Sequence, residues 1–339
     1  MRKIILILIF LVFTLTACNL PALPVTGLNP VSAGAIWLTS DPNRPATATP
    51  FMPDASLNPT ATPENVVEAT PNQEPTESVI KRPDQQVNIL ILGSDFRPGQ
   101  GYRTDVFMLL SLYPKEGTAS VISFPRDLYI YLPGIGNQRI NVAQPFGGFE
   151  LSKAVLEENF GVTADHYVMT NFQGFKGIIN SLGGINVNVS QYLSDHCELP
   201  QGDANKNCTV YAGVNYMDGD TALWYVRSRY STSDLDRTRR AQEVILAIFS
   251  KLMSLNAISR APELYNLYIN SVETDLTVSD ILQLLPLATS ILNDTSKLRR
   301  YAIGISEVTP TTLPQSGAAV LLPNFDAIHQ LILQSAYTP

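Results

Sequence analysis

Acidic and basic side chains recur in pairs along the stretch from residue 93 to residue 127. The pairs are Asp95 with Arg97, Arg103 with Asp105, and Arg126 with Asp127. They lie at the ends of two apolar runs, 106–112 and 119–124, that carry almost no charge. In α/β proteins, loops that follow strand ends commonly carry the chemistry. We therefore expect these pairs to converge on an anionic ligand that bears phosphate.

Arginines also crowd the stretch from Met217 to Leu255. Its members are Arg227, Arg229, Arg237, Arg239 and Arg240. Arg227 and Arg229 would point the same way in an extended segment, whereas Arg237 and Arg240 share one face of a helix and Arg239 points elsewhere. Arginines at a helix N-terminus oppose the helix dipole and need a compensating anion. Asp234 and Asp236 could supply it in a salt-bridge network, but a pyrophosphate fits better, because guanidinium forks match phosphate oxygens.

Alternating apolar runs and helical patterns must position these side chains. Strands are expected at 87–92, 106–112, 119–124, 128–132, 166–170 and 185–189, with helices at 151–159 and 172–182. Asp218 is placed to cap a further helix through 222–225. The interleaving predicts an α/β fold, a three-layer α-β-α sandwich around a mixed central sheet. His166 stands in one of the expected strands, and we interpret it as structural.

The C-terminal part has no cluster of chemical groups and is expected to complete the same domain. Its patterns predict helices at 262–269, 278–292 and 327–333 and a strand at 301–305. Pro286 should kink or split the second of these helices, since proline lacks the backbone donor.

The N-terminus has the features of an export signal. Arg2 and Lys3 precede an apolar run that ends in Leu-Thr-Ala-Cys, which resembles a lipobox with Cys18 as the lipidated residue. An uncleaved signal anchor is the alternative, although the apolar run is short for a membrane span. We thus expect a signal peptide at 1–17 and a disordered, proline- and threonine-rich tether at 18–86. The domain at 87–336 would then be lipid-anchored at the outer face of the cytoplasmic membrane.

Composition narrows the function classes. The 339 residues carry a net charge of -7, which argues against a general nucleic-acid-binding protein. Besides Cys18, the only thiols are Cys197 and Cys208, which flank a polar loop. A disulfide is the favoured interpretation in an extracytoplasmic protein. A metal pair with the neighbouring His196 is the alternative, but it lacks further ligands nearby.

Six motifs occur in an order that resembles the LytR–CpsA–Psr family of cell-envelope glycopolymer transferases. They read GSDFR, RTD, FPRD, then RIN with a glycine pair, GVNYMDGDTALWYVRSR and DLDRTRRAQ. The resemblance is strongest over residues 87–255. It implies transfer of a glycopolymer from a polyprenyl-pyrophosphate carrier to peptidoglycan, assisted by Mg²⁺. It also implies an apolar tunnel beneath the sheet for the lipid tail.

The resemblance assigns roles to residues of this chain. Asp95 and Asp105 match the acidic positions associated with Mg²⁺. The arginines that would grip the pyrophosphate are Arg103, Arg126, Arg227, Arg229, Arg237 and Arg240. Gln242 matches a glutamine of the last motif, but Ala241 stands where the family often has a second glutamine. Of these residues, Asp105, Arg126 and Arg103 are the expected catalytic group.

The residues by themselves leave the reaction partly open. Phosphoryl transfer is mostly positioning and charge neutralisation, so the same site with water as acceptor would be a hydrolase of lipid pyrophosphates. Asp105 or Asp95 could accept the proton of an attacking hydroxyl. No arrangement for a nucleophilic Ser or Cys is evident, which favours direct transfer. A third possibility is a non-catalytic lipoprotein that binds envelope polymers.

Overall fold

The computed structural model describes residues 81–96, 101–229, 234–254 and 271–339. All of them belong to one compact unit, Pro75–Pro339. The expected signal peptide with Cys18, the expected helix at 262–269, Arg97 and most of the expected tether lie outside the described residues. Within the described part of the chain, no helix is both long and apolar enough to cross a bilayer.

A mixed sheet of six strands forms the centre of the unit. Its spatial order is β11 (Glu273–Thr274), β6 (His166–Asn171), β1 (Val87–Ser94), β2 (Thr104–Tyr113), β3 (Thr118–Ser123) and β12 (Leu298–Ala302). The β1–β6 and β3–β12 pairs are parallel and the other pairs are antiparallel. The predicted mixed sheet is confirmed, and its strands carry the apolar runs seen in the sequence.

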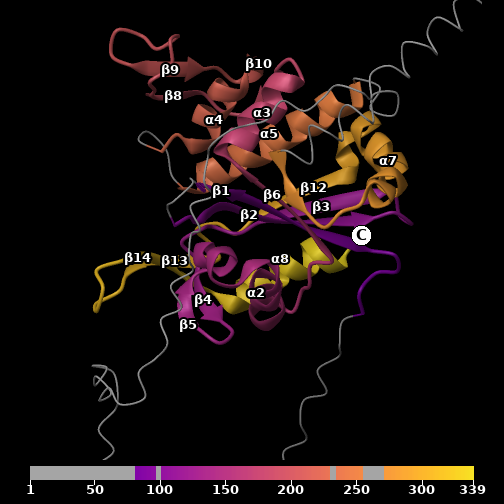
Figure 1. Ribbon diagram of the computed structural model, residues 1–339. Helices are drawn as coiled ribbons and strands as arrows, with labels where there is room; N and C mark the ends of the chain where they lie inside the picture. The colour runs from indigo at the N-terminus through magenta and orange to yellow at the C-terminus, as the bar shows by residue number, and fades with distance from the viewer. Residues whose placement is uncertain (1–80, 97–100, 230–233, 255–270) are drawn as a thin grey trace, which may run out of the picture. The chain divides into compact units, whose positions relative to one another are not determined.

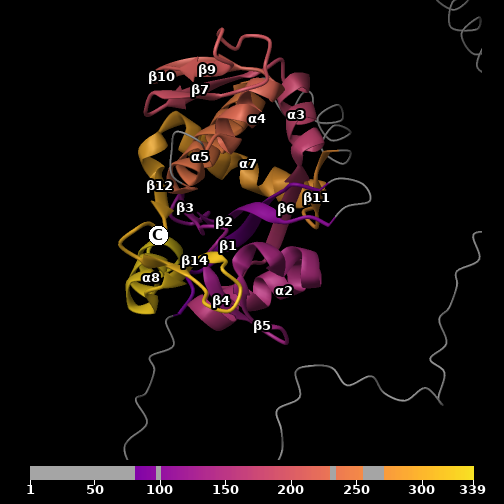
Figure 2. The same ribbon diagram turned by 90° about the vertical axis from the view of Figure 1, so that its left-hand side faces the viewer.

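Helices cover both faces of this sheet, which confirms the three-layer sandwich (Figures 1 and 2). On one face lie α2 (Ala143–Phe160), which is non-helical at Gly147 and Gly148, and α8 (Phe325–Ile332). On the other lie α3 (Phe172–Ser181), α4 (Gly219–Arg227), α5 (Asp234–Ser254) and α7 (Val278–Asn293).

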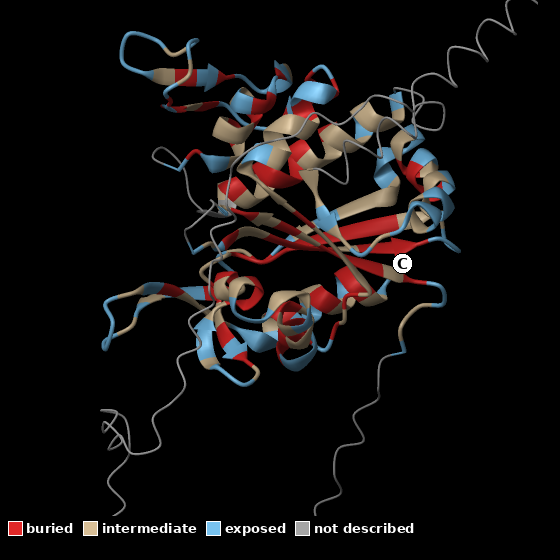
Figure 3. Ribbon diagram, viewed as in Figure 1, coloured by how far each residue is buried: buried red, intermediate tan, exposed pale blue. Residues whose placement is uncertain are grey.

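The two faces of the sheet carry different cores because side chains alternate along each strand. Leu90 and Leu92 of β1 pack into the cluster that includes Leu156 of α2 and Ile328 of α8. Ile89 and Ile91 point the other way, toward Leu287 of α7. Long buried runs accordingly lie along β1, β2 and β3, whereas β6 and β12 are mostly half-buried (Figure 3). Ile91 is only half-buried, so the packing on its face is less complete.

Four two-stranded sheets of the described residues lie outside the central sheet. Two of them, β7 (Ile185–Val189) with β10 (Gly213–Met217) and the hairpin of β8 (Leu193–His196) with β9 (Asn207–Val210), lie beyond α4 (Figures 1 and 2). The other two are β4 (Tyr129–Leu132) with β5 (Gly136–Arg139), and β13 (Val308–Thr312) with β14 (Ala319–Pro323). A disulfide joins Cys197 and Cys208, whose Cα atoms are 5.6 Å apart, and both residues are buried.

Three boundaries differ from the expectations. Pro286 does not split α7, because residues on both sides of it, such as Leu284 and Leu287, pack on the same apolar cluster. The strand expected at 301–305 is β12 and ends at Ala302, since it follows β3 in parallel register from Leu298. Arg227 is the last residue of α4 instead of part of an extended segment. The cap of this helix is as predicted, because the Asp218 carboxylate accepts a hydrogen bond from the Thr221 N–H at 2.8 Å.

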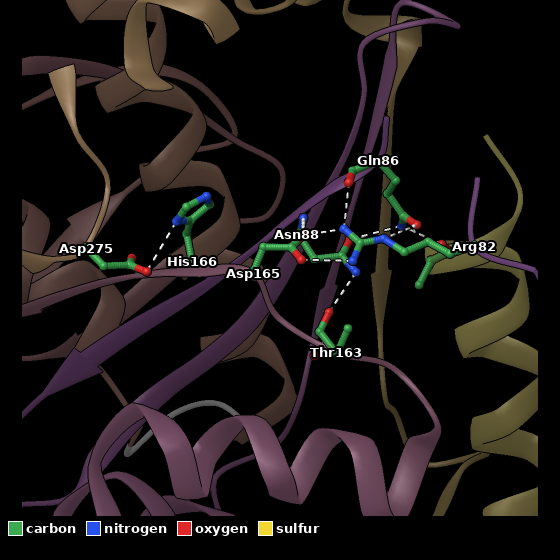
Figure 4. A network of polar contacts seen from close by, with 8 residues as sticks. Arg82, Gln86, Asn88, Thr163, Asp165, His166 and Asp275 are labelled. Atoms are coloured by element: carbon green, nitrogen blue, oxygen red, sulfur yellow. Dashed lines mark hydrogen bonds and ion pairs between the residues drawn. The ribbon is translucent and has the colours of Figure 1, made fainter. Parts of the chain in front are cut away.

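The folded part begins before Val87, inside the segment expected to be tether (Figure 4). The two terminal nitrogens of Arg82, Nη1 and Nη2, donate to the carboxylate of Asp165, with Nη1 to Oδ1 at 2.8 Å. Gln86 donates from Nε2 to Asn88 Oδ1 at 2.9 Å and to the Ala336 carbonyl at 2.6 Å. This network ties the chain entry to β6 and to the C-terminal segment, so residues from Arg82 onward belong to the domain.

We expect Arg82→Ala to lower the free energy of unfolding by about 1–2 kcal/mol, the usual range for hydrogen bonds to a charged group. Burial alone raises the pKa of Asp165, but hydrogen bonds from Arg82 and from the Asn88 N–H outweigh it, so the pKa is lowered overall. A carboxyl with a lowered pKa contributes stability that is present above its unfolded pKa and is lost as the pH falls through the folded pKa. Urea denaturation at pH 7 and pH 3.5 measures both effects.

Lys81→Ala is the matched control, because Lys81 is exposed and its ion pair with Asp84 is long, at 3.7 Å. It should leave stability within about 0.5 kcal/mol of wild type at both pH values. In Arg82→Ala, the acid-dependent loss should be smaller than in wild type. Equal stability of the two variants at pH 7 would contradict an anchoring role for Arg82.

Candidate functional site

Four strand termini lie together at one end of the sheet: the end of β1, the start of β2, the end of β3 and the end of β6. Because β1 and β2 are antiparallel, the end of β1 lies beside the start of β2, where Ser94 pairs with Thr104. β3 is antiparallel to β2, so its end returns to the same edge, and β6, parallel to β1, ends there with Asn171 beside Ser94. A Cβ on Gly93 would lie 3.0 Å from the Val106 Cβ, so glycine allows this close pairing. Asp95, Arg103, Asp105 and Arg126 thus come together as expected, whereas Arg97 lies outside the described residues.

Asp95 and Arg103 extend the β1–β2 pairing by one step. The Asp95 N–H donates to the Arg103 carbonyl at 3.1 Å, and the Arg103 N–H donates to Asp95 Oδ1 at 2.6 Å. The guanidinium of Arg103 is 3.8 Å from Asp95 Oδ2, and its side chain is 56% exposed. The backbone therefore fixes the carboxylate of Asp95, while the arginine head can still turn toward a ligand.

Asp105 and Arg126 form the tighter pair. Arg126 Nη1 donates to Asp105 Oδ1 at 2.9 Å, and Arg126 Nε lies 3.3 Å from Asp127 Oδ2. Arg139 of β5 approaches the other oxygen of Asp127 at 3.3 Å. Asp127 thus orients Arg126 and joins it to the β4–β5 hairpin, whereas Asp105 faces the cavity described below.

Helices α4 and α5 bring the second set of arginines over the same edge. The guanidinium carbon of Arg227 lies 4.4 Å from the centroid of the Phe172 ring, the first residue of α3. Such stacking holds a planar cation in place without using its N–H donors. Arg229 follows beyond the end of α4, and Arg237 in the first turns of α5 is buried.

One cavity of about 730 Å³ joins these groups. Its charged lining residues at the strand edge are Asp95, Asp105, Arg103, Arg126, Arg227, Arg229 and Arg237. Its body, between the sheet and the helices α3, α4 and α5, is lined by apolar side chains, including Ile89, Ile91, Leu110, Val168, Phe175, Ile245 and Ile248. The arrangement suits an amphipathic ligand with an anionic head and a long apolar tail.

Two lining residues escaped the sequence interpretation. The hydroxyl of Ser228 lies between the two arginines in sequence, is buried, and has no hydrogen-bond partner among the described residues. Phe172 supplies the surface on which Arg227 stacks. Ser228 lies between the two arginines of the VRSR motif, and a single serine there carries no signal of its own. Nothing local in the sequence marks Phe172 as a partner of Arg227.

Arg240 and Gln242 do not line the cavity. Arg240 is fully buried, donates to the Ser228 carbonyl, and lies 5.8 Å from the Tyr225 ring centroid; burial lowers its pKa. Gln242 donates from Nε2 to Ser123 Oγ at 2.7 Å and to the Tyr301 carbonyl at 2.8 Å. Both residues fasten α5 to its neighbours, so the structure places them behind the cavity wall.

Arg239 takes part in an intramolecular salt-bridge network, which was the alternative to a bound pyrophosphate for this group of arginines. Its Nη1 donates to Glu243 Oε1 at 2.7 Å, and its Nη2 lies 3.9 Å from Asp236. The other oxygen of Glu243 accepts from the Tyr225 hydroxyl at 2.6 Å; burial and then this hydrogen bond raise the pKa of Tyr225. The network therefore uses Arg239, which points away from the shared face of Arg237 and Arg240 as expected.

His166, which we interpreted as structural, does not line this cavity. Its Nδ1 lies 3.2 Å from Asp275 Oδ2, and Oδ1 of the same carboxylate accepts from the Tyr167 N–H at 2.9 Å (Figure 4). Among the described residues, no cluster of three or more His, Cys, Asp or Glu side chains could enclose a metal ion. Asp95 and Asp105 provide two carboxylates at the cavity mouth, a donor set that suits a hard cation shared with phosphate oxygens.

The sequence is similar to those of known proteins. Residues 56–308 match the sequence model of the LytR_cpsA_psr family. The polyisoprenyl-teichoic acid–peptidoglycan teichoic acid transferase TagU of Oceanobacillus iheyensis is 33% identical over 226 residues, which is 64% of this chain and 68% of TagU. The enzyme of the same description named TagT, from Bacillus subtilis, is 32% identical over 210 residues, 60% of this chain and 64% of TagT.

Solved structures of similar proteins share this fold. Bacillus subtilis TagV superposes with a TM-score of 0.61 at 24% identity, covering 76% of this chain and 100% of TagV. A structure of TagT bound to LI-WTA superposes with a TM-score of 0.57 at 25% identity, covering 74% of this chain and 90% of that chain.

Proposed function

The chain belongs to the LytR_cpsA_psr family, and on that premise we propose that it is a glycopolymer phosphotransferase. It moves a glycopolymer from a polyprenyl-pyrophosphate carrier to peptidoglycan. The similar transferases TagU and TagT support the reaction class by the activities in their names. The observation that carries the proposal is the cavity itself, which joins five arginines and the carboxylates of Asp95 and Asp105 at the strand ends to an apolar body.

The carrier fits this cavity by its chemistry. A pyrophosphate needs several cations, and guanidinium groups bind phosphate oxygens in pairs. Arg126, Arg227 and Arg237 stand on separate elements around the mouth, so they can surround the pyrophosphate from different sides. The apolar body serves as the tunnel for the polyprenyl tail, since burying hydrocarbon there removes it from water. Arg240 and Gln242 support this mouth from behind as positioning residues.

The reaction follows from these positions. The hydroxyl oxygen of the acceptor attacks the phosphorus that is bonded to the glycopolymer, and a new P–O bond forms. The P–O bond to the bridging oxygen of the pyrophosphate breaks, and polyprenyl phosphate leaves. The hydroxyl proton passes to Asp105 or Asp95, the two carboxylates at the mouth. The arginines stabilise the charge on the phosphates, which is the main requirement of phosphoryl transfer.

We include Mg²⁺ in the proposal as the cofactor. Asp95 and Asp105 are the residues that would hold it, because Mg²⁺ is commonly bound by one or two carboxylates together with substrate phosphates. Bound there, the ion would neutralise phosphate charge. Both carboxylates line the same cavity and each keeps oxygen lone pairs beyond its arginine contacts, so the donor set fits.

Removing divalent cations should therefore slow transfer by about 10²-fold, with recovery on adding Mg²⁺. Asp95→Asn should raise the Mg²⁺ concentration needed for half-maximal rate, because one carboxylate ligand is lost. Rates measured over a Mg²⁺ titration after chelation test both points. Asp326→Asn, an exposed carboxylate at the start of α8, is the control and should titrate as wild type. A rate that does not respond to chelation would exclude this cofactor.

Export and anchoring complete the proposal. The signal-like residues 1–17 would direct export and then be removed. A lipidated Cys18 and the tether would hold the domain at the outer face of the cytoplasmic membrane, where both lipid carrier and peptidoglycan are within reach. The disulfide between Cys197 and Cys208 supports an oxidising compartment. Mass spectrometry of the membrane-extracted protein tests the anchor, which predicts a diacylglycerol on Cys18 and no residues before it.

The purified full chain in detergent, given a polyprenyl-pyrophosphate-linked saccharide and peptidoglycan fragments, tests the reaction. Transfer predicts a phosphodiester-linked product and one polyprenyl phosphate released for each linkage. Cleaved donor without linked product would mean a hydrolase. Binding of the donor without any cleavage would mean a polymer-binding lipoprotein.

A further inference from the structure

A second cavity, of about 540 Å³, adjoins the first at its polar end. The two cavities share Ser94, Thr170, Asn171 and Val272 in their linings. Ser94 and Asn171 are the paired last residues of β1 and β6, and Asp95 follows directly. The second cavity therefore meets the first beside the carboxylate of Asp95. The apolar body of the first cavity lies further away, near the start of β1, where Ile89 and Ile91 line it. The lining residues of the second cavity come in part from β6, β11 and the first turn of α3, and these three elements lie on the same side of the molecule (Figure 2).

The second cavity has a different chemistry from the first. Its side chains include the aromatic rings of Phe96 and Tyr102, the amides of Asn171 and Gln173, the hydroxyl of Ser271 and the carboxylate of Glu273. No Lys, Arg or His is among the described residues that line it. The described lining residues thus offer a polyanion or a pyrophosphate no cation, whereas the five arginines of the first cavity suit both.

Aromatic rings with amides and a carboxylate are the groups that hold a sugar ring. The Phe96 and Tyr102 rings meet edge to face, with centroids 5.7 Å apart, and Phe96 is 43% exposed. Asp95 and Arg103 pair through their backbones and so hold these neighbouring rings opposite each other. An exposed ring offers the apolar face of a pyranose a surface to pack on, while its hydroxyls need donors and acceptors.

Donors are available at this site. Asn171 uses Oδ1 to cap α3, accepting from the Gln173 and Gly174 N–H groups at 3.0 Å each, which leaves its amide N–H groups for other partners. Gln173 is exposed, and its side-chain amide makes no hydrogen bond to any described residue. A Cβ on Gly174 would lie 2.2 Å from the Ser271 carbonyl oxygen, so glycine lets α3 pack directly against the chain at Ser271, another lining residue.

We propose that the second cavity binds uncharged pyranose rings of the acceptor glycan strand. This inference rests on the proposed transferase function and specifies its second substrate site. The attacking and leaving oxygens lie roughly in line through the phosphorus. With polyprenyl phosphate leaving into the apolar body of the first cavity, the acceptor hydroxyl must arrive from its polar end, where the second cavity opens.

The saccharide of the donor is the competing occupant, since it is also a sugar. The absence of cations among the described lining residues disfavours it when that polymer is anionic. Kinetics can separate the two. If the second cavity holds the acceptor, changes there alter the KM for the acceptor; if it holds the donor saccharide, they alter the KM for the donor.

Gln173→Ala and Tyr102→Ala test the proposal in the full chain in detergent, with a peptidoglycan tetrasaccharide as acceptor. Each variant should raise the acceptor KM by about tenfold, the effect of losing one good contact, and leave the donor KM unchanged. Gln330→Ala on α8 and Tyr131→Ala on β4 are matched controls, exposed on the opposite face of the sheet, and should keep wild-type values. Thermal unfolding of each variant checks that the fold is intact.

An unchanged acceptor KM in both variants, or a raised donor KM, overturns the proposal. If wild type forms no linked product, the proposed transferase function fails by itself. Calorimetric titration of the same tetrasaccharide then still decides the second cavity: weaker binding to Gln173→Ala and Tyr102→Ala than to the two controls supports it, and equal binding overturns it.

Discussion

Asp105→Asn should reduce the rate of glycopolymer transfer by about 10³-fold, the scale of losing a general base or a metal-binding carboxylate. Asp105 lies at the cavity mouth with Arg126 Nη1 at 2.9 Å from its Oδ1. Asparagine keeps an oxygen that can accept from Arg126 but removes the negative charge. The loss should therefore appear in kcat, with the donor KM changing little. Initial rates with saturating acceptor measure it.

The fold should survive this substitution. The Asp105 side chain is 25% exposed, and its ion pair with Arg126 is partly solvated, so stability should change by about 1 kcal/mol or less. Asp326→Asn is the control for loss of an acidic side chain at an exposed position. If Asp105→Asn folds, binds donor and transfers at the wild-type rate, the carboxylate has no part in the chemistry and the non-catalytic interpretation gains.

Arg227→Ala should lower kcat/KM for the donor by about 10²-fold, the effect of removing one charged donor from a site of developing negative charge. The guanidinium carbon of Arg227 lies 4.4 Å from the centroid of the Phe172 ring. This stacking fixes the plane of the guanidinium group and therefore the directions of its N–H groups. Arg227→Lys keeps the charge but loses the planar fork and the stacking. It should therefore recover only part of the loss, between alanine and wild type.

Arg300→Ala is the matched control, since Arg300 on β12 is exposed and outside the first cavity. It should leave donor kinetics unchanged. Equal activity of Arg227→Lys and wild type would show that charge alone matters and that the stacked geometry does not. Full activity of Arg227→Ala would remove this arginine from the pyrophosphate site.

Local sequence patterns predicted the parts of the fold that depend on neighbouring residues. The apolar runs at 87–92 and 106–112 became β1 and β2, because a strand buried on both faces needs continuous apolar side chains. Asp95, Arg103, Asp105 and Arg126 lie close together because strand order and direction bring those strand ends to the same end of the sheet.

Features that depend on distant partners could not be predicted in this way. The start of the domain at Arg82 rests on Asp165, and the tether-like composition around it gave no hint of that partner. Helical spacing predicted that Arg237 and Arg240 share a face, but spacing does not tell how deep each lies. Arg237 reaches the cavity, whereas Arg240 is covered by the end of α4, where the Ser228 carbonyl accepts from it.

A crystal structure of the chain with polyprenyl pyrophosphate and Mg²⁺ would show whether one cavity holds both halves of the carrier. We expect the pyrophosphate among Arg126, Arg227 and Arg237 with Mg²⁺ at Asp95 and Asp105, and the prenyl chain along Ile91, Leu110 and Ile245. A prenyl chain outside this cavity, or phosphates away from these arginines, would contradict it.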